Sequence, residues 1–402
     1  MFDMPITAAI VLSALLGAPS GEIAFLSGAE QEDRTVSIID VESREVRRIG
    51  NGNRDDAPVW SPDGKRIAFS SITDLNGETG MAVFVVNADG SNLRPLNHGK
   101  SYNRNPAWAP DNLTLAYSAG NGEPICVPNE EGGRDCFAVS GLHDSLFVYN
   151  LADDTETEWS GGIWQFEASD DKNRGRPFGF MRPVWVEGPL LLFAVLAGGE
   201  EMSELGDIDI RDPSSVERSL LAIGITGSLG NFSMDLFVVT KSTAVPFPPV
   251  MLPSRGEYAE WAPHPDPKGR ALVFESNDGG DREIFIITKK GPYDLSNHRA
   301  ADWNPVWAPN GDFVAFESFR DGRRGIYRVN PDTALVSPIA VGEDYDNWHP
   351  TWSPDSEWIA YVSNRTGSPE LFVTNRNGED TIQITDSKAE NLAPAWRPKG
   401  DK

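Results

Sequence analysis

Apolar and polar residues alternate in short runs along most of the chain after residue 20. Runs such as "RIAFSS", "FVAFES" and "WIAYVS" place aromatic or β-branched residues beside small or polar ones. Gly, Pro, Asp and Asn interrupt these runs about every ten residues, a spacing typical of short strands joined by tight turns. Outside the N-terminal segment we find no long stretch with a helical period. The pattern therefore predicts an all-β chain.

A tryptophan formula, Pro-x-Trp-(Ser/Ala)-Pro-(Asp/Asn)-Gly, recurs along the chain. Clear copies are "APVWSPDG" and "NPVWAPNG", and each is followed by an apolar strand, a polar loop and two further strands. The short spacings between copies match the roughly 40 to 50 residues of one four-stranded propeller blade. The Pro-Asp-Gly step supplies a tight turn. Seven copies, some of them weak, contain Trp60, Trp108, Trp185, Trp261, Trp307, Trp352 and Trp396.

The two ends of this repeat complement each other. Residues 21–49 have the second to fourth strands of a unit without a Trp strand, and "NLAPAWRP" near the C-terminus is a Trp strand with nothing after it. A β-propeller in which the C-terminal strand closes the first blade explains both ends and leaves no long free edge. We expect seven four-stranded blades. Six or eight remain open, because the units after Trp108 and Trp185 are longer than the others.

The repeat resembles that of TolB-type, PD40 (WD40-like) β-propellers. The stretches "DDAPVWSPDGKRIAFSS" and "ADWNPVWAPNGDFVAFESFRDGRRGIYRVN" carry the resemblance, which extends over about residues 21–398. It implies a propeller fold, whereas the functions of such propellers vary. Relatives include periplasmic scaffold proteins that bind other envelope proteins, propellers attached to prolyl-oligopeptidase-like hydrolases, and oligogalacturonate lyases with a manganese site. We cannot match the lyase ligand set to residues of this chain.

The N-terminus predicts export. The apolar stretch from Ile6 to Ala18 is too short to span a bilayer and resembles the hydrophobic part of a secretory signal. We expect a signal peptide at residues 1–20, no membrane span, and a periplasmic or secreted protein. Residues 21–402 would form a single TolB-like propeller domain with inserts near 119–142, 161–181 and 224–258.

Charge and motifs narrow the range of functions. The chain has 60 acidic and 35 basic residues and a net charge of −25, which argues against a nucleic-acid partner. It has no G-x-S-x-G, H-E-x-x-H, P-loop or dinucleotide motif. The five histidines have no metal-ligand spacing. His349, which directly precedes a proline at the start of a Trp strand, is the histidine closest to the expected channel rim.

Cys126 and Cys136 lie in one insert, "ICVPNEEGGRDC". In an oxidising compartment they would form a disulfide that fixes this loop. A zinc site is less favoured, because there is no nearby histidine.

The loops that lead into the Trp strands would gather around the mouth of the central channel. They carry aromatic and charged residues where a simple turn would suffice. Aromatic residues with Arg are typical of protein interfaces, although the two tryptophans could instead pack over neighbouring blades. Four acidic residues could also ring the channel and hold Ca²⁺: Asp55, Asp56, Asp302 and Asp346. The candidate mouth residues are Asp56, Tyr102, Arg104, Asp302, Trp303, Asp346, Trp348 and His349.

These observations favour a non-catalytic, exported scaffold propeller. We expect it to be a monomer that needs no cofactor and binds a protein, or alternatively a glycan, through the mouth loops. The rival hypothesis is a metal-assisted, lyase-like enzyme acting on a polysaccharide, with His349 and mouth carboxylates as ligands. A third hypothesis is a detached sensor or stalk module.

Overall fold

The structure is a computed structural model that describes most of the chain. The described residues are 17–75, 78–96, 102–120, 125–128, 134–137, 145–158, 177–185, 191–198, 220–222, 232–240, 243–244, 260–277, 280–288, 291–387 and 389–400. Within these ranges the regular structure is β-strand apart from one short 3-10 helix, η1 (Gln31–Asp33). No described helix is long and apolar enough to cross a membrane.

Six sheets of four strands each follow one another as blades. Blade 1 contains β3 (Val46–Arg48), β2 (Thr35–Asp40), β1 (Glu22–Gly28) and β31 (Glu390–Trp396). Blade 2 contains β4 (Asp56–Trp60), β5 (Arg66–Leu75), β6 (Glu78–Asn87) and β7 (Arg94–Leu96). Blade 3 contains β8 (Tyr102–Trp108), β9 (Thr114–Gly120), β12 (Ser145–Asn150) and β13 (Thr155–Glu158). A single parallel pairing, Met81 with Tyr102, joins blades 2 and 3 into one larger sheet.

The C-terminal half supplies three regular antiparallel blades. Blade 4 contains β19 (Glu260–Pro265), β20 (Ala271–Ser276), β21 (Glu283–Thr288) and β22 (Gly291–Asp294). Blade 5 contains β23 (Asp302–Trp307), β24 (Val314–Ser318), β25 (Gly325–Asn330) and β26 (Leu335–Ala340). Blade 6 contains β27 (Asn347–Trp352), β28 (Trp358–Ser363), β29 (Glu370–Asn375) and β30 (Thr381–Gln383).

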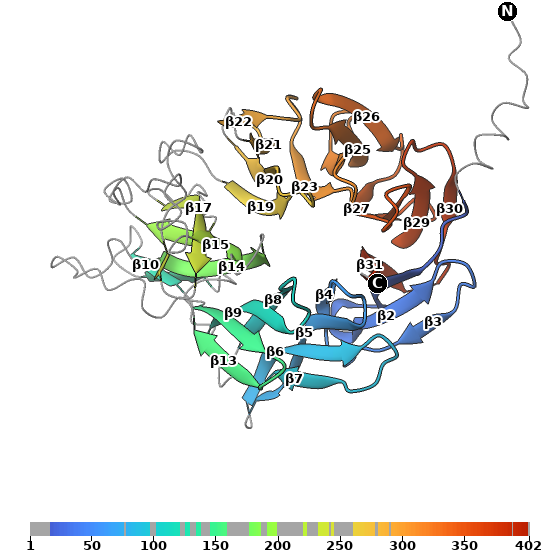
Figure 1. Cartoon of the computed structure of the whole chain (residues 1–402). Coiled ribbons are helices and arrows are strands. Elements are labelled where there is room, and N and C mark those ends of the chain that lie inside the picture. The colour runs from blue at the N-terminus through green and yellow to red at the C-terminus, as the bar shows by residue number, and fades with distance from the viewer. Residues whose placement is uncertain are drawn as a thin grey trace, which may run out of the picture.

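The blades stand in a ring, with the first strand of each repeat on the inner side and the last strand outside (Figure 1). The predicted closure is confirmed, because β31 pairs antiparallel with β1 from Ile23–Trp396 to Gly28–Glu390. The last strand of the chain is therefore the innermost strand of the first blade. This pairing covers the edge of β1 that would otherwise be open.

The prediction of seven four-stranded blades is wrong, because the described residues form six. Between blades 3 and 4 lies a five-stranded sheet made of β14 (Pro177–Trp185), β15 (Leu191–Gly198), β16 (Leu220–Ala222), β17 (Phe232–Thr240) and β18 (Thr243–Ala244). In this sheet β16 pairs parallel with β15, so the strands do not follow the simple antiparallel order of a blade. Its unit has "VEGP" after Trp185 instead of a Pro-Asp-Gly turn, and the sequence that follows departs from the repeat.

One further hairpin stands outside the blades. Strands β10 (Ile125–Pro128) and β11 (Arg134–Phe137) pair antiparallel, and their register sets Cys126 directly opposite Cys136. Directly opposed positions in an antiparallel pair have Cα atoms about 4.5 to 5.5 Å apart, within the range that a disulfide spans. The backbone is therefore compatible with the predicted disulfide.

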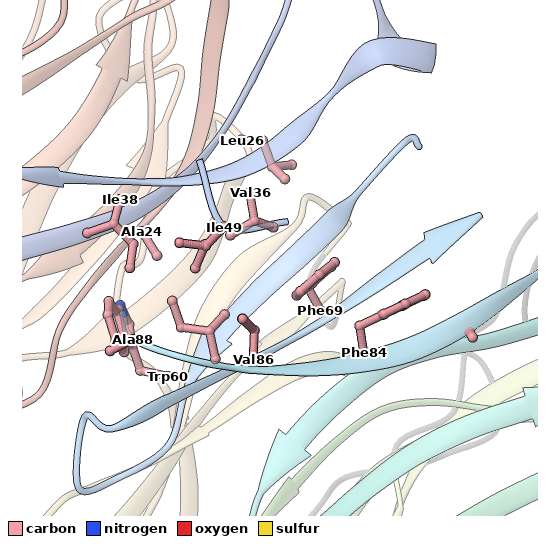
Figure 2. Packing of buried hydrophobic residues seen from close by; sticks show 12 residues of the cluster. Ala24, Leu26, Val36, Ile38, Ile49, Trp60, Phe69, Phe84, Val86 and Ala88 are labelled. Atoms are coloured by element: carbon pink, nitrogen blue, oxygen red, sulfur yellow. The ribbon is translucent and has the colours of Figure 1, made fainter. Parts of the chain in front are cut away.

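The core lies between blades. Figure 2 shows the contact of blades 1 and 2, where Val36, Ile38 and Ile49 meet Trp60, Phe69 and Phe84, all of them buried. The tryptophan indoles also bond neighbouring blades: Trp60 Nε1 donates to the carbonyl of Ala395 at 2.9 Å. The same bond recurs from Trp108, Trp307 and Trp352 to the preceding blade. Each of these four tryptophans thus contributes both apolar burial and one directed hydrogen bond to the contact with the preceding blade.

One copy of the formula is shifted in the structure. Trp261 pairs with Glu275 in the same way that Trp303, not Trp307, pairs with Glu317. The position of the blade tryptophan in blade 4 is therefore taken by Pro265, and our assignment of Trp261 to it is wrong.

Candidate functional site

The innermost strands begin with a shared irregularity. After their second or third residue the register shifts, so that the strand gains one residue relative to its partner. The extra residue has a positive φ: 54° at Asn105, 50° at Asn304, 53° at His349 and 48° at Ala393. A bulge of this kind bends the strand and redirects its side chains. His349 therefore occupies a position set by the repeat, where asparagine tolerates the left-handed backbone most easily.

A buried glutamate in blade 4 holds the bulge of blade 5. Glu275 is fully buried, and its Oε1 accepts the backbone N–H of Asn304 at 2.6 Å. Its Oε2 accepts Nε of Arg282 at 2.5 Å. The carboxylate thus connects β20 and the loop before β21 to the first strand of the next blade.

Blade 5 repeats the same arrangement toward blade 6. The fully buried Glu317 accepts the backbone N–H of His349 at 2.8 Å and Nδ2 of Asn304 at 2.9 Å. Its other oxygen pairs with Nε of Arg324. Removing a buried charge from water is costly unless several hydrogen bonds compensate, and here each carboxylate has an arginine and at least one N–H donor.

The two arginines stack on the two predicted tryptophans. The guanidinium of Arg282 lies 5.9 Å from the ring centroid of Trp303, and that of Arg324 lies 5.6 Å from the same ring. Arg324 also lies 5.7 Å from the ring of Trp348. Phe319, 40% exposed, packs on Trp303 with ring centroids 5.2 Å apart. We call these five residues, Arg282, Trp303, Phe319, Arg324 and Trp348, the mouth strip.

Of the other predicted mouth residues in these blades, Asp302 is directed inward and Asp346 lies at the surface. Asp302 is fully buried, and its Oδ2 accepts Nη2 of Arg320 at 2.7 Å. Asp346 is half-buried, accepts the backbone N–H of Arg324 at 3.2 Å, and lies 3.6 Å from Nη1 of Arg323. Asp302 therefore stabilises the blade, whereas Asp346 flanks the mouth strip.

The remaining candidates lie in blades 2 and 3. Asp56 is exposed at the start of β4, and the half-buried Arg104 lies at the equivalent place in β8. Tyr102 begins β8, but its side chain is outside the described residues. No described contact connects these three residues to the mouth strip. Among the contacts of the described residues, Trp303 and Trp348 are brought together, and Asp346 lies at the border of the mouth strip.

The acids considered for Ca²⁺ are not gathered at one point. Asp55 is buried between blades 1 and 2, where it accepts the backbone N–H of Val36 at 2.9 Å and Oγ of Ser71 at 2.6 Å. Burial raises the pKa of the Asp55 carboxyl, while these hydrogen bonds oppose the shift. Across the described ranges no group of three or more His, Cys, Asp or Glu side chains could hold a metal ion. His98 and His143 lie outside those ranges.

Sequence reasoning missed Arg282, Phe319 and Arg324, which belong to loops between the second and third strands of their blades. A signal was present. Both buried glutamates are followed by an arginine at the same spacing, in "ESNDGGDR" and "ESFRDGRR".

Comparison with known proteins shows that the chain is similar to TolB proteins. No family model matches it. Over 136 residues it is 28% identical to a TolB homolog of Chlorobium chlorochromatii, a match that covers 33% of this chain and 30% of that protein. A TolB homolog of Chlorobium luteolum is also 28% identical, over 137 residues, with the same coverage of 33% and 30%. The match thus spans less than a third of either relative.

Solved structures extend the likeness to nearly the whole fold. TolB from Acinetobacter baumannii superposes with a TM-score of 0.51 at 15% identity, covering 98% of this chain and 71% of that one. The β-propeller domain of the Trilobed protease from Pyrococcus furiosus gives 0.57 at 15% identity, covering 92% and 96%. An acylaminoacyl peptidase from Pyrococcus horikoshii gives 0.55 at 13% identity, covering 92% and 51%. At these identities the likeness concerns the fold alone. The resemblance predicted from the repeat is confirmed, and the chain is a β-propeller similar in fold to TolB.

Proposed function

We propose that this chain is a non-catalytic propeller that binds a protein partner through the mouth strip. The observation that carries the proposal is the stacking of both Arg282 and Arg324 on the ring of Trp303, next to the exposed ring of Phe319. Tryptophan, other aromatic residues and arginine are the residue types that dominate the binding energy of protein interfaces. A TolB-like propeller fold is consistent with a protein-binding module.

The mouth strip is ordered before any partner arrives. The buried carboxylates of Glu275 and Glu317 hold the two arginines, whose side chains remain 38% and 27% exposed. Fixed side chains lose little conformational entropy on binding, so more of the contact energy appears as affinity. The partially exposed guanidinium groups lie beside an exposed aromatic ring, which suits a protein surface that combines an apolar side chain with hydrogen-bond acceptors.

The test compares three forms of the protein as bait on an envelope extract. One is the wild type, one carries Trp303→Ala with Phe319→Ala, and one carries Leu335→Ala. Leu335 is 68% exposed on β26 of the same blade and is outside the mouth strip. We expect a partner that is retained by the wild type and by Leu335→Ala but lost by the double variant.

Binding of the purified partner then gives the decisive number. Loss of one central interface residue typically costs 2 kcal/mol or more, which is about a 30-fold increase in Kd. The proposal fails if the double variant, correctly folded by circular dichroism, binds every captured protein as tightly as the wild type does.

We further propose that the chain is exported to the periplasm or secreted. The support is the apolar stretch from Ile6 to Ala18 and the TolB likeness; residues 1–16 are outside the described ranges. Expression of the full chain in a Gram-negative host, followed by fractionation and N-terminal sequencing, tests this. We expect a shortened protein outside the cytoplasm. An uncleaved protein that stays in the cytoplasm would refute export.

A further inference from the structure

Two buried carboxyl groups lie at the junction of blades 4 and 5, each at the start of a strand. Glu283 begins β21 and is 5% exposed, and Asp302 begins β23 and is 0% exposed. The backbone N–H of Asp302 donates to the carbonyl of Arg282, the residue before Glu283, at 2.6 Å. A main-chain bond between the blades therefore brings together the starts of the two strands that carry these carboxyl groups.

Each carboxyl group has one oxygen with a partner and one without. Oε2 of Glu283 accepts Oγ of Ser296 at 2.6 Å and the backbone N–H of His298 at 3.4 Å, and Oδ2 of Asp302 accepts Nη2 of Arg320 at 2.7 Å. Oε1 of Glu283 and Oδ1 of Asp302 are both buried and have no hydrogen-bond partner among the described residues. Buried polar atoms without partners are rare and costly.

The junction of blades 6 and 1 shows how the same position is satisfied elsewhere. There the backbone N–H of Asn391 donates to the carbonyl of Pro369 at 2.9 Å, the counterpart of the bond from Asp302 to Arg282. Glu370, in the place of Glu283, accepts Oγ1 of Thr385 as Glu283 accepts Ser296. The difference lies in the next contact, where Nδ2 of Asn391 donates to Oε2 of Glu370 at 2.7 Å.

Blade 5 has an aspartate where this second junction has an asparagine. An ionised carboxylate only accepts hydrogen bonds, so Asp302 cannot supply the donor that the amide of Asn391 supplies. A single proton on one of the two carboxyl groups would supply it. Arg320 already stabilises the charge of Asp302, so the proton belongs on Glu283.

We propose that Glu283 is protonated in the folded protein at neutral pH and donates a hydrogen bond to Asp302, so that the junction of blades 4 and 5 is a pH-sensitive contact. Deprotonation would leave two buried negative charges side by side and weaken this junction. Because Arg282 precedes Glu283 and Trp303 follows Asp302, the change would reach the mouth strip. The proposal itself does not require a binding partner.

The other charged groups around the pair agree with this assignment. Burial, and then the charges of Asp302 and Asp294, raise the pKa of Glu283 to about 8, against the hydrogen bonds from Ser296 and His298. Burial also raises the pKa of Asp294, which accepts the backbone N–H of Asn297.

Two further side chains face Asp302. Arg320 is the cation in contact with it, with Nη2 2.7 Å from Oδ2. Tyr327, whose hydroxyl donates to Asp321 at 2.6 Å, has its own pKa raised mainly by burial and in small part by the charge of Asp302.

The sign of the effect follows from linkage. Because the folded state holds a proton that the unfolded state releases above its ordinary pKa of 4.5, stability is fully present below that pH and is lost as the pH rises toward 8. Within this interval the unfolding equilibrium constant rises up to tenfold per pH unit from this group.

Asp302→Asn is the decisive variant, because it copies the Glu370–Asn391 pair into blade 5. We expect the variant to lose less stability than the wild type between pH 6 and pH 8.5. The infrared band of a protonated carboxyl group should be present in the wild type at pH 7 and absent from the variant. The reciprocal change, Asn391→Asp, should add pH dependence in the same range.

Glu283→Gln keeps the proposal testable if Asp302→Asn fails to fold. The glutamine amide can donate a hydrogen bond to Asp302 without taking up a titratable proton. The Glu283→Gln variant should fold and also lack both the infrared band and the pH dependence. The proposal is overturned if the wild type shows no protonated carboxyl band at pH 7. It is equally overturned if the wild type, Asp302→Asn and Glu283→Gln lose stability in parallel as the pH rises.

Discussion

Glu317→Ala is the substitution that most directly tests how blades 5 and 6 are held together. The carboxylate of Glu317 is fully buried and accepts bonds from Arg324, from the side chain of Asn304 and from the backbone of His349. Removing one member of a buried ion pair costs about 3 to 5 kcal/mol. Each neutral donor left without a partner adds about 1 to 3 kcal/mol unless water reaches it.

The side chain of Arg324 is 27% exposed, so water can reach part of the vacated site. We therefore expect a loss of about 4 kcal/mol in the free energy of unfolding, within the range for broken buried pairs. With a denaturant dependence of about 5 kcal/mol per molar guanidinium chloride, the midpoint would fall by about 0.8 M. Tryptophan fluorescence during guanidinium unfolding is the assay, since the chain has 12 tryptophans.

Asp312→Ala is the matched control in the same blade. Asp312 and Lys268 form an ion pair at 3.2 Å with both side chains about half exposed, and such a pair contributes at most about 1 kcal/mol. The loss in unfolding free energy for Glu317→Gln should lie between the losses for these two variants, because its amide oxygen still accepts hydrogen bonds from N–H groups but the charge is gone. If the free energies of unfolding of Glu317→Ala and Asp312→Ala differ by less than about 1 kcal/mol, the buried glutamates do not hold the blades together and the reasoning is wrong.

Three further predictions concern other parts of the fold. Cys126 and Cys136 should form a disulfide in the exported protein, seen by mass spectrometry as a cross-linked peptide that separates on reduction; free thiols at both positions would contradict it. Gly378→Ala should destabilise more than Gly367→Ala. Both glycines have positive φ, of 79° and 99°, but only the first would place its Cβ 2.3 Å from a carbonyl of the neighbouring blade; equal melting temperatures would count against this clash. Burial lowers the pKa of His264 to about 4, so its contribution to stability is present above pH 6.5 and lost as the pH falls toward 4. His264→Leu should therefore lose less stability than the wild type from pH 7 to pH 5, and parallel curves would argue against burial of a neutral imidazole.

The ring closure was predictable because each end of the chain lacked what the other possessed. A Trp strand ending in Trp396 had no following strands, and the first three strands had no Trp strand. The blade count was not predictable to the same degree. Sequence periodicity counts tryptophans, and it counted the unit of Trp185, which folds as a five-stranded sheet with a parallel strand pair. The same counting placed the tryptophan of blade 4 at Trp261, although the bulge puts Pro265 at that position.

The site was predicted in part for a similar reason. Trp303 and Trp348 stood out because a short connection needs no large aromatic residue. Arg282 and Arg324 are separated from the tryptophans by one or two full strands, and only the packing of blades 4, 5 and 6 brings the four side chains together. Asp302 is a residue type that binds ligands, but it is buried with Arg320, a partner in the loop between β24 and β25.

The pairing of β31 with β1 has a consequence for biosynthesis. The other five blades lie between β1 and β31 in the sequence, so blade 1 stays unfinished until all of them have been synthesised. During that interval β1 presents unpaired main-chain groups that invite association between nascent chains. A truncation that removes β31 would therefore leave this edge permanently open and lower the solubility of the protein.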